Sequence, residues 1–179
     1  MLTAFLFPGQ GSQKVSMGYD LYKNTDVGKE YFDLANDIMA CNIKDIIFNG
    51  PDEKLKETVF TQPAIFIVSV IIGKILIDRG LMPAMVAGHS LGEYSACTIS
   101  GSFSFENGLS LVKLRAENMQ IAGKTNPGTM AAIIGMSFED IQNICTTTSE
   151  ENCIVVPANH NSPNQIVISG NKPAVEEAM

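Results

Sequence analysis

The apolar residues of the first two thirds of the chain include two short runs, each followed by a glycine-containing turn. The runs TAFLF (3–7) and PAMVAG (83–88) predict buried strands, because short continuous apolar runs suit strands covered on both faces. The turn PGQGSQ (8–13) follows the first strand, and SLGEYSACTIS (90–100) predicts a helix after the second. Strand, short glycine-rich loop and helix in this order are typical of an α/β fold with a parallel sheet.

Helical spacing fills the stretch between these two strands. From about position 17 to 48, Phe32, Ala35 and Met39 recur at intervals of three and four, which predicts a helical face turned to the core. The strongest helix is predicted over 61–80, which is apolar nearly all round and should be buried on several sides.

The sequence marks both ends of this helix. Thr61 is expected to cap it, Pro63 falls in its first turn, and Gly80 follows its last turn. Its longest apolar run is broken by Lys74, well short of the length of a membrane span. We therefore interpret it as a core helix.

The pattern changes after the helix predicted over 104–123, which Ser104 should cap. Beyond the linker GKTNPG (123–128), five segments predict strand, helix, strand, strand and the opening of a helix: MAAIIGM, SFEDIQNICTTTS, IVVPAN, NQIVISG and KPAVEEAM. This is the order of a split βαβ, ferredoxin-like unit without its last strand. We predict two domains, 1–124 and 125–179, and poor solubility from the open sheet edge of the second.

Composition narrows the function classes. The 179 residues are 45% hydrophobic and 17% charged, which indicates a globular chain. A net charge of −7 argues against a general nucleic-acid or anionic-membrane binder. The four cysteines form no C-x-x-C pair and predict reduced thiols in a cytoplasmic protein.

Two glycine-rich stretches resemble nucleotide motifs and fail them. GQGSQK has Lys14 where a dinucleotide fingerprint needs its third glycine, and GKT (123–125) has Asn118 where a P-loop needs its first. The two histidines are far apart and no metal-ligand spacing occurs, so no metal site is predicted.

The candidate chemistry lies in VAGHSLGEYSA (86–96), where Ser90 stands between Gly88 and Gly92. A tight strand-to-helix turn brings these two glycine positions together, so side chains there would collide. Ser90 would then lie at a helix N-terminus, where free N–H groups favour an oxyanion. Both a nucleophile and a simple helix-capping serine fit this pentapeptide, and Glu93 suits the first turn of the helix in either case.

Five motifs together resemble the malonyl-CoA:acyl carrier protein transacylases, the acyltransferase family of fatty acid and polyketide synthesis. In order they are FPGQGSQ, TQPA, GHSLGEYSA, LVKLRAENMQ and ANHNSPNQIVISG, and they extend over the chain as the family's N-terminal portion. The resemblance implies an incomplete α/β-hydrolase-like parallel-sheet core with an incomplete, inserted ferredoxin-like subdomain.

The resemblance also implies roles for individual residues. Ser90 matches the nucleophile that becomes acylated by malonyl-CoA and passes malonyl to the phosphopantetheine thiol of acyl carrier protein. The backbone N–H groups of Gln10 and Leu91 match the oxyanion hole, and Gly9 and Gly11 allow the loop around Gln10 to approach a ligand closely. No metal or redox cofactor is implied, since a coenzyme A thioester is the substrate.

Arg115 matches the family's carboxylate clamp, and the sequence supports an anionic partner independently. It lies on one helical line with Leu111 and Met119, an apolar stripe in which a guanidinium needs an acceptor. A structural salt bridge to an Asp or Glu is the alternative. His89 is interpreted as a packed, hydrogen-bonded residue or a pocket-lining one, and Gln62 as a second residue lining the site.

The general base is not identified within the chain. The resemblance implies a histidine downstream of Met179, and His160 is the only histidine after Ser90. In an extended segment His160 would face away from both Asn159 and Asn161, which makes it a weak candidate.

Several functions therefore stay open at the level of sequence: malonyl transfer in fatty acid synthesis, a polyketide-type acyltransferase, a serine hydrolase, and a catalytically silent fragment that only binds a partner. A carboxylate clamp argues against the hydrolase, because a simple esterase needs none.

Overall fold

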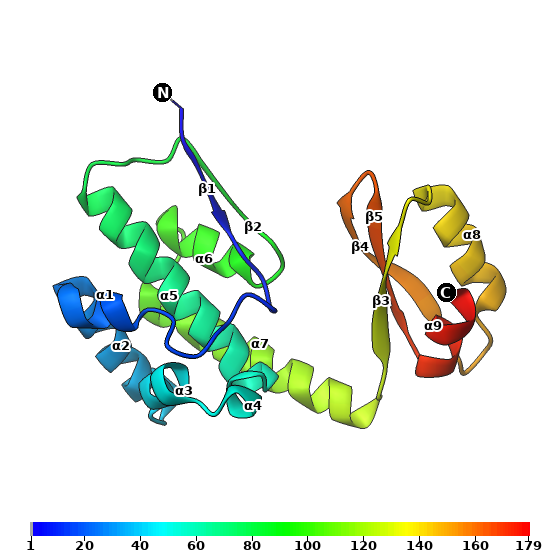
Figure 1. The fold of residues 1–179 in the computed structure, drawn as a ribbon, viewed down its shortest axis with the longest axis horizontal. Coiled ribbons are helices and arrows are strands. Elements are labelled where there is room, and N and C mark those ends of the chain that lie inside the picture. The colour runs from blue at the N-terminus through cyan, green and yellow to red at the C-terminus, as the bar shows by residue number, and fades with distance from the viewer. Residues whose placement is uncertain (1) are drawn as a thin grey trace. The chain divides into compact units, whose positions relative to one another are not determined.

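The computed structural model describes residues 2–179, which form two compact units (Figure 1). The N-terminal unit ends at Gln120, and the C-terminal unit comprises Ile121–Met179. Helix α7 (Phe105–Thr125) runs through this division, so the predicted boundary between 124 and 125 falls at the end of the helix. One sheet is parallel and the other antiparallel, which makes the fold mixed α/β.

The N-terminal unit is mainly helical, with one small sheet. Its elements in chain order are β1 (Ala4–Phe7), α1 (Tyr19–Asn24), α2 (Asp26–Met39), α3 (Ile43–Asn49), α4 (Asp52–Leu55), α5 (Thr58–Asp78), β2 (Met85–Gly88), α6 (Gly92–Ile99) and α7.

The two predicted strands pair in parallel, from Ala4 opposite Met85 to Phe7 opposite Gly88. Phe5 and Phe7 are buried in the helical core, but Leu6 is 79% exposed and Met85 62%. The prediction that both strands are buried is thus correct for one face of the sheet and wrong for the other. Alternate side chains of a strand point to opposite faces, and in the described residues the helices bury only one of them.

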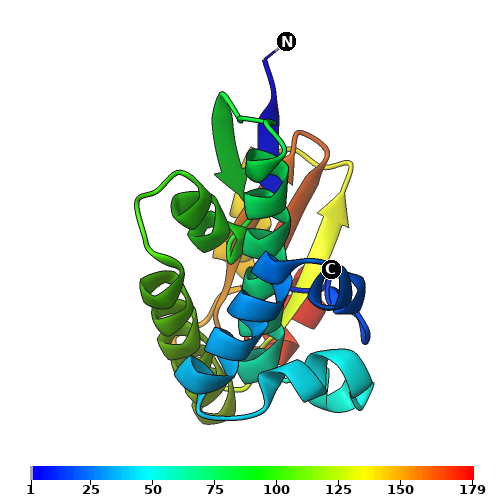
Figure 2. The ribbon, with the colours of Figure 1, turned by 90° about the vertical axis from the view of Figure 1, so that its left-hand side faces the viewer.

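Helix α5 is the centre of the N-terminal core and packs against α2, α3, α4 and α6, as Figure 2 shows for α2 and α6. It is long and apolar enough to cross a membrane by length and composition, but 61% of that window is buried inside the protein. The helix begins at Thr58, three residues before the predicted start, so the expected cap by Thr61 is wrong. Thr61 is instead fully buried in the first turns, where its hydroxyl donates to the carbonyl of Leu55 at 2.5 Å.

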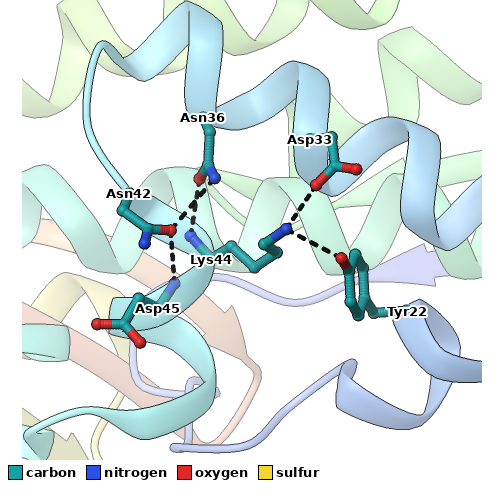
Figure 3. Close-up of polar contacts among 6 residues, drawn as sticks. All are labelled: Tyr22, Asp33, Asn36, Asn42, Lys44 and Asp45. Carbon is teal, nitrogen blue, oxygen red and sulfur yellow. Dashed lines mark hydrogen bonds and ion pairs between the residues drawn. The ribbon is translucent and has the colours of Figure 1, made fainter.

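Helices α1, α2 and α3 are joined by a polar network around Lys44 (Figure 3). Its ammonium group donates to Asp33 at 2.5 Å and to the Tyr22 hydroxyl at 3.0 Å, and its backbone N–H donates to Asn36 at 3.0 Å. The hydrogen bond to Asp33, and next the one to Tyr22, raises the pKa of Lys44. Phe32, Ala35 and Met39 of α2 are all buried, which confirms the predicted core face of this helix.

The C-terminal unit has the predicted element order. After α7 come β3 (Thr129–Ile134), α8 (Phe138–Thr148), β4 (Val155–Ser162), β5 (Gln165–Gly170) and α9 (Lys172–Ala178). The strands form an antiparallel sheet in the order β3-β5-β4, and both helices contact the sheet and each other.

A small core lies between this sheet and its helices. It consists of Ile141, Cys145, Val155, Ile166, Ile168, Ala174 and Val175. Burial raises the pKa of the Cys145 thiol, so this cysteine is neutral and structural. Ser137 caps α8 by accepting a hydrogen bond from the Asp140 N–H at 3.1 Å.

Candidate active site

A sharp turn between β2 and α6 presents Ser90. The strand ends at Gly88, the helix begins at Gly92, and Ser90 between them has a φ of 54°. Left-handed backbone is costly for a residue with a side chain, and it turns the serine out of the strand direction into solvent. A Cβ on Gly88 would lie 1.9 Å from the carbonyl carbon of Gly92, which confirms the predicted collision.

The loop after β1 lies directly against this turn. The His89 N–H donates to the carbonyl of Phe7 at 3.0 Å. A Cβ on Gly92 would lie 2.2 Å from the Phe7 oxygen, and one on Gly9 would lie 2.7 Å from the His89 oxygen. The glycine-rich loop therefore lies close to the turn after β2, and this brings the Gln10 segment next to Ser90. Its expected close approach to a ligand stays a prediction.

Backbone donors are available at this contact. Within residues 2–179, neither the N–H of Gln10 nor that of Leu91 donates a hydrogen bond inside the protein. Leu91 stands at the N-cap position of α6, and its side chain is only 1% exposed, so its backbone is held firmly by the core.

Arg115 reaches the same point from α7. One terminal nitrogen, Nη2, donates to Ser90 Oγ at 2.9 Å, and the other, Nη1, donates to Gln62 Oε1 at 2.6 Å. The guanidinium also lies over the Tyr94 ring, 5.9 Å from its centroid. None of the ion pairs among residues 2–179 involves Arg115, which argues against the alternative of a structural salt bridge.

The apolar stripe proposed for Arg115 is only partly buried. Leu111 is 41% exposed and Met119 45%, because the core-facing side of α7 is formed by Leu109, Val112 and Ala116 instead. Arg115 lies at the margin between the buried face and solvent. A guanidinium at such a margin is held by neighbours on one side and open to an anion on the other.

Gln62 connects these parts from inside the protein. Its side chain in α5 is 0% exposed, and its Nε2 lies 3.4 Å from Gln10 Oε1 and 3.2 Å from Met119 Sδ. The structure thus brings four predicted site residues together: Gln10, Gln62, Ser90 and Arg115.

The two histidines have different surroundings. A Cβ on Gly9 would lie 2.9 Å from His89 Nδ1, so the His89 ring lies against the loop that carries Gln10. His160 belongs to β4 of the C-terminal unit, opposite Ile166, and stacks on Phe138 at 5.6 Å between ring centroids.

The predicted alternation along β4 holds only in part. Exposure alternates from Val155 to His160, but Asn161 is exposed like His160. The register shifts between His160 and Ser162, which breaks the alternation. His160 and Asn159 therefore differ in exposure as expected, whereas His160 and Asn161 do not.

Sequence reasoning missed Tyr94, which lies under the guanidinium of Arg115. Tyr94 lies in the first turn of α6, four positions after Ser90, but Ser90 has left-handed backbone and lies outside the helix, so no helical spacing in the sequence relates the two. A groove of about 670 Å³ lies elsewhere in the N-terminal unit, along β1 and α5, and is lined by residues such as Leu6, Val68 and Ile72 and not by Ser90 or Arg115.

The chain belongs to the acyl transferase domain family, whose model matches residues 4–179. It is 41% identical over 175 residues to the malonyl CoA-acyl carrier protein transacylase of Bacillus subtilis, covering 98% of this chain but 55% of that protein. The corresponding protein of Staphylococcus aureus is 39% identical over 175 residues, and the match covers 98% of this chain and 56% of that protein. The chain thus spans about half the length of these relatives.

Solved structures agree with this assignment. The malonyl CoA-acyl carrier protein transacylase of Coxiella burnetii superposes with a TM-score of 0.93 at 39% identity, covering 99% of this chain and 56% of the other. A malonyl-transacylase solved in complex with its type II polyketide acyl-carrier protein gives 0.92 at 40% identity, with 99% and 58% covered.

Proposed function

We propose that this chain carries the nucleophile, oxyanion hole and carboxylate clamp of a malonyl-CoA:acyl carrier protein transacylase. The observation that carries the proposal is the 2.9 Å hydrogen bond between Arg115 Nη2 and Ser90 Oγ. It holds a guanidinium that forms no ion pair among residues 2–179 next to a serine on a strained turn. An acyl group with a free carboxylate is the substrate that suits both groups at once.

In the first step, Ser90 Oγ attacks the thioester carbonyl of malonyl-CoA while a base takes the hydroxyl proton. The carbonyl oxygen becomes an oxyanion that accepts hydrogen bonds from the N–H groups of Gln10 and Leu91. The C–S bond then breaks, coenzyme A leaves as its thiol, and malonyl remains as an ester on Ser90. Arg115 holds the malonyl carboxylate throughout.

In the second step, the phosphopantetheine thiol of acyl carrier protein attacks this ester, and Ser90 is regenerated as the hydroxyl. Each step transfers the same acyl group without oxidation or reduction, so the proposed mechanism uses no redox cofactor. Among the described residues, the hydrogen bond to Ser90 Oγ comes from Arg115, so the base remains the part to be located by experiment.

The finer architecture belongs to the same proposal. The parallel β1-β2 pair with its elbow is the beginning of an α/β-hydrolase-like core, and the β-α-β-β-α order of the C-terminal unit is that of a ferredoxin-like subdomain. A cytoplasmic location is consistent with malonyl-CoA as substrate.

A polyketide-type acyltransferase is the second candidate. It is favoured by the likeness to a malonyl-transacylase solved with a type II polyketide acyl-carrier protein. The chemistry at Ser90 is the same, and the two candidates differ in the carrier protein that accepts malonyl.

The test is intact mass after incubation with malonyl-CoA or acetyl-CoA. We expect a malonyl adduct that is absent in Ser90→Ala and present in the control Ser100→Ala, which removes an exposed serine at the end of α6. Arg115→Gln should reduce malonyl loading more than tenfold and remove the preference over acetyl, because the charge-assisted hydrogen bonds to the malonyl carboxylate are lost.

Other outcomes select the rivals. Rapid loss of the adduct to water would favour a hydrolase. A folded chain without any adduct would show that these residues alone are silent. Transfer of the adduct to one type of carrier protein over another separates fatty acid from polyketide synthesis.

A further inference from the structure

Gln62 is a fully buried amide between two parts of the candidate site. Its oxygen accepts from Arg115 Nη1 at 2.6 Å, and its nitrogen faces Gln10 Oε1 at 3.4 Å and Met119 Sδ at 3.2 Å. A buried amide without these partners would be destabilising, because no water could replace them. The amide therefore has one stable orientation, with its oxygen toward Arg115.

The backbone of Gln62 is also fixed. It lies in α5 between Thr61, whose hydroxyl is bonded to the Leu55 carbonyl, and Pro63, which has no freedom in φ. Both neighbours are buried in the core. The Gln62 oxygen is consequently held in a fixed position, from which it can restrain the guanidinium of Arg115.

The guanidinium of Arg115 is held at both terminal nitrogens, by Gln62 at Nη1 and by Ser90 at Nη2. Two fixed nitrogens define the plane of the group. The contact with Ser90 must change when that serine is acylated, whereas the contact with Gln62 involves no reacting atom. Gln62 is therefore the contact that can keep the guanidinium oriented through both steps of the reaction.

The neutral side chain at position 62 is important for the charge balance. A glutamate here would pair with Arg115 and compensate its charge inside the protein. The amide oxygen accepts the same hydrogen bond and leaves the positive charge available for the carboxylate of an acyl group. Orientation without neutralisation is what a clamp for an anionic substrate requires.

We propose that Gln62 is a positioning residue that orients Arg115 toward the substrate carboxylate and links this clamp to the loop carrying Gln10. The proposal rests on the proposed function for the identity of the anion, but the orientation of Arg115 by Gln62 can be tested without any reaction.

The chain contains only two arginines, so NMR of the arginine side chains is simple. In the ligand-free protein, the restrained Arg115 should show separate Nη1 and Nη2 signals, while exposed Arg79 shows averaged ones and serves as an internal reference. Gln62→Met keeps the side-chain length and removes the acceptor, so the Arg115 signals should average. Gln142→Leu, an exposed glutamine in α8, is the matched control and should change nothing.

Titration with malonate then measures how tightly Arg115 binds a free carboxylate. We expect Gln62→Met to weaken malonate binding about tenfold, the usual loss for one hydrogen bond to a charged group. Gln62→Glu should keep the Arg115 signals separate and yet weaken malonate more than Gln62→Met does, because the charge is compensated. A role in packing alone predicts no such difference between the two variants.

The outcomes separate the two proposals. Separate Arg115 signals and malonate affinity within about twofold of the wild type in folded Gln62→Met would overturn the positioning role. Averaging of the Arg115 signals in Gln62→Met, with no malonate binding by the wild type, would keep the positioning role and reject the carboxylate clamp. If Gln62→Met does not fold, Gln62→Glu decides: malonate affinity within about twofold of the wild type in this variant would overturn the positioning role.

Discussion

The two units of this chain build their sheets in opposite ways. In the N-terminal unit, β1 pairs in parallel with β2, so that Ala4 lies opposite Met85. Five helices separate the two strands in the sequence. In the C-terminal unit, β4 and β5 form an antiparallel pair joined by a short turn. Parallel pairing requires a long crossover, whereas an antiparallel pair can close locally.

This difference explains where the chemistry lies. The parallel pairing places the loop after β1 beside the turn after β2, and hydrogen bonds join both to α5 and α7. These four segments supply Gln10, Ser90, Gln62 and Arg115. The C-terminal sheet is assembled from β3, β4 and β5, which all lie within about forty residues of one another and pair in antiparallel fashion. The candidate site thus depends on the pairing of two strands that are far apart in the sequence, whereas the C-terminal sheet pairs strands that are close in the sequence.

The largest effect should come from Gly92→Ala, which adds a side chain where the turn after β2 lies against the end of β1. A Cβ there meets the Phe7 oxygen at 2.2 Å, and neither backbone segment can move without breaking the β1-β2 pair. We expect a loss of about 4 kcal/mol or more in the free energy of unfolding of the N-terminal unit. Denaturant unfolding followed by NMR signals of each unit measures it.

Gly123→Ala is the matched control, because a Cβ at this helical position has no atom within 4 Å. It should stabilise α7 by about 0.5–1 kcal/mol, as alanine is the better helix former. Equal effects of the two substitutions would show that the turn after β2 is not crowded.

Ile168→Ala tests the local scaffold in the same way. Ile168 is 1% exposed in the core of the C-terminal sheet, and its truncation should cost about 3 kcal/mol. If the units fold independently, hydrogen exchange should accelerate in β3, β4 and β5 while the amides of α5 keep their protection. Equal acceleration in both units would contradict the comparison.

A smaller effect is expected for the helix caps. Ser137→Ala removes the acceptor for the Asp140 N–H at the start of α8, and Ser104→Ala does the same for Asn107 in α7. Each should cost about 1 kcal/mol, and each in its own unit only. Thermal unfolding monitored by unit-specific NMR signals would show whether the losses stay separate.

The smallest effect should follow Lys44→Met, which removes the contacts of the ammonium group with Asp33 and Tyr22 shown in Figure 3. The Asp33 side chain is 59% exposed, so the loss should be about 0.5 kcal/mol. Because the folded-state pKa of Lys44 is raised, its contribution is complete below the ordinary lysine pKa of about 10.4 and is lost as the pH rises through the folded value. Wild type and variant should therefore converge in stability above that range, and a constant difference would contradict this.

Much of the fold could be predicted from the sequence, because the pattern of each element agrees with its final surroundings. The C-terminal order could be predicted from its succession of short apolar segments, and the burial of Phe32, Ala35 and Met39 from their spacing. The predicted start of α5 is wrong, because Thr61 is a residue type that often caps helices, whereas here its hydroxyl donates a hydrogen bond to the carbonyl of Leu55. An apolar run likewise does not reveal which strand face remains uncovered, as Leu6 shows.

The site was predictable as far as motifs define single residues. Gly88 and Gly92 predicted the sharp turn, and the structure shows that side chains at these positions would collide with nearby backbone atoms. Contacts between motifs were not predictable, because no spacing in the sequence places Gln62 against Arg115 or Tyr94 under the guanidinium. Such contacts depend on the side-chain directions of packed helices, which follow only from the three-dimensional structure.

The long reach from β1 to β2 has a consequence during synthesis. Ribosomes add about 5–20 residues per second, so the roughly eighty residues that separate the two strands take on the order of 4–16 s to emerge. During this time β1 still lacks its partner β2, and Phe5 and Phe7 are exposed on the nascent chain. The order of translation thus makes the amino-terminal strand a natural binding segment for chaperones, and the serine turn one of the last parts of its unit to be assembled.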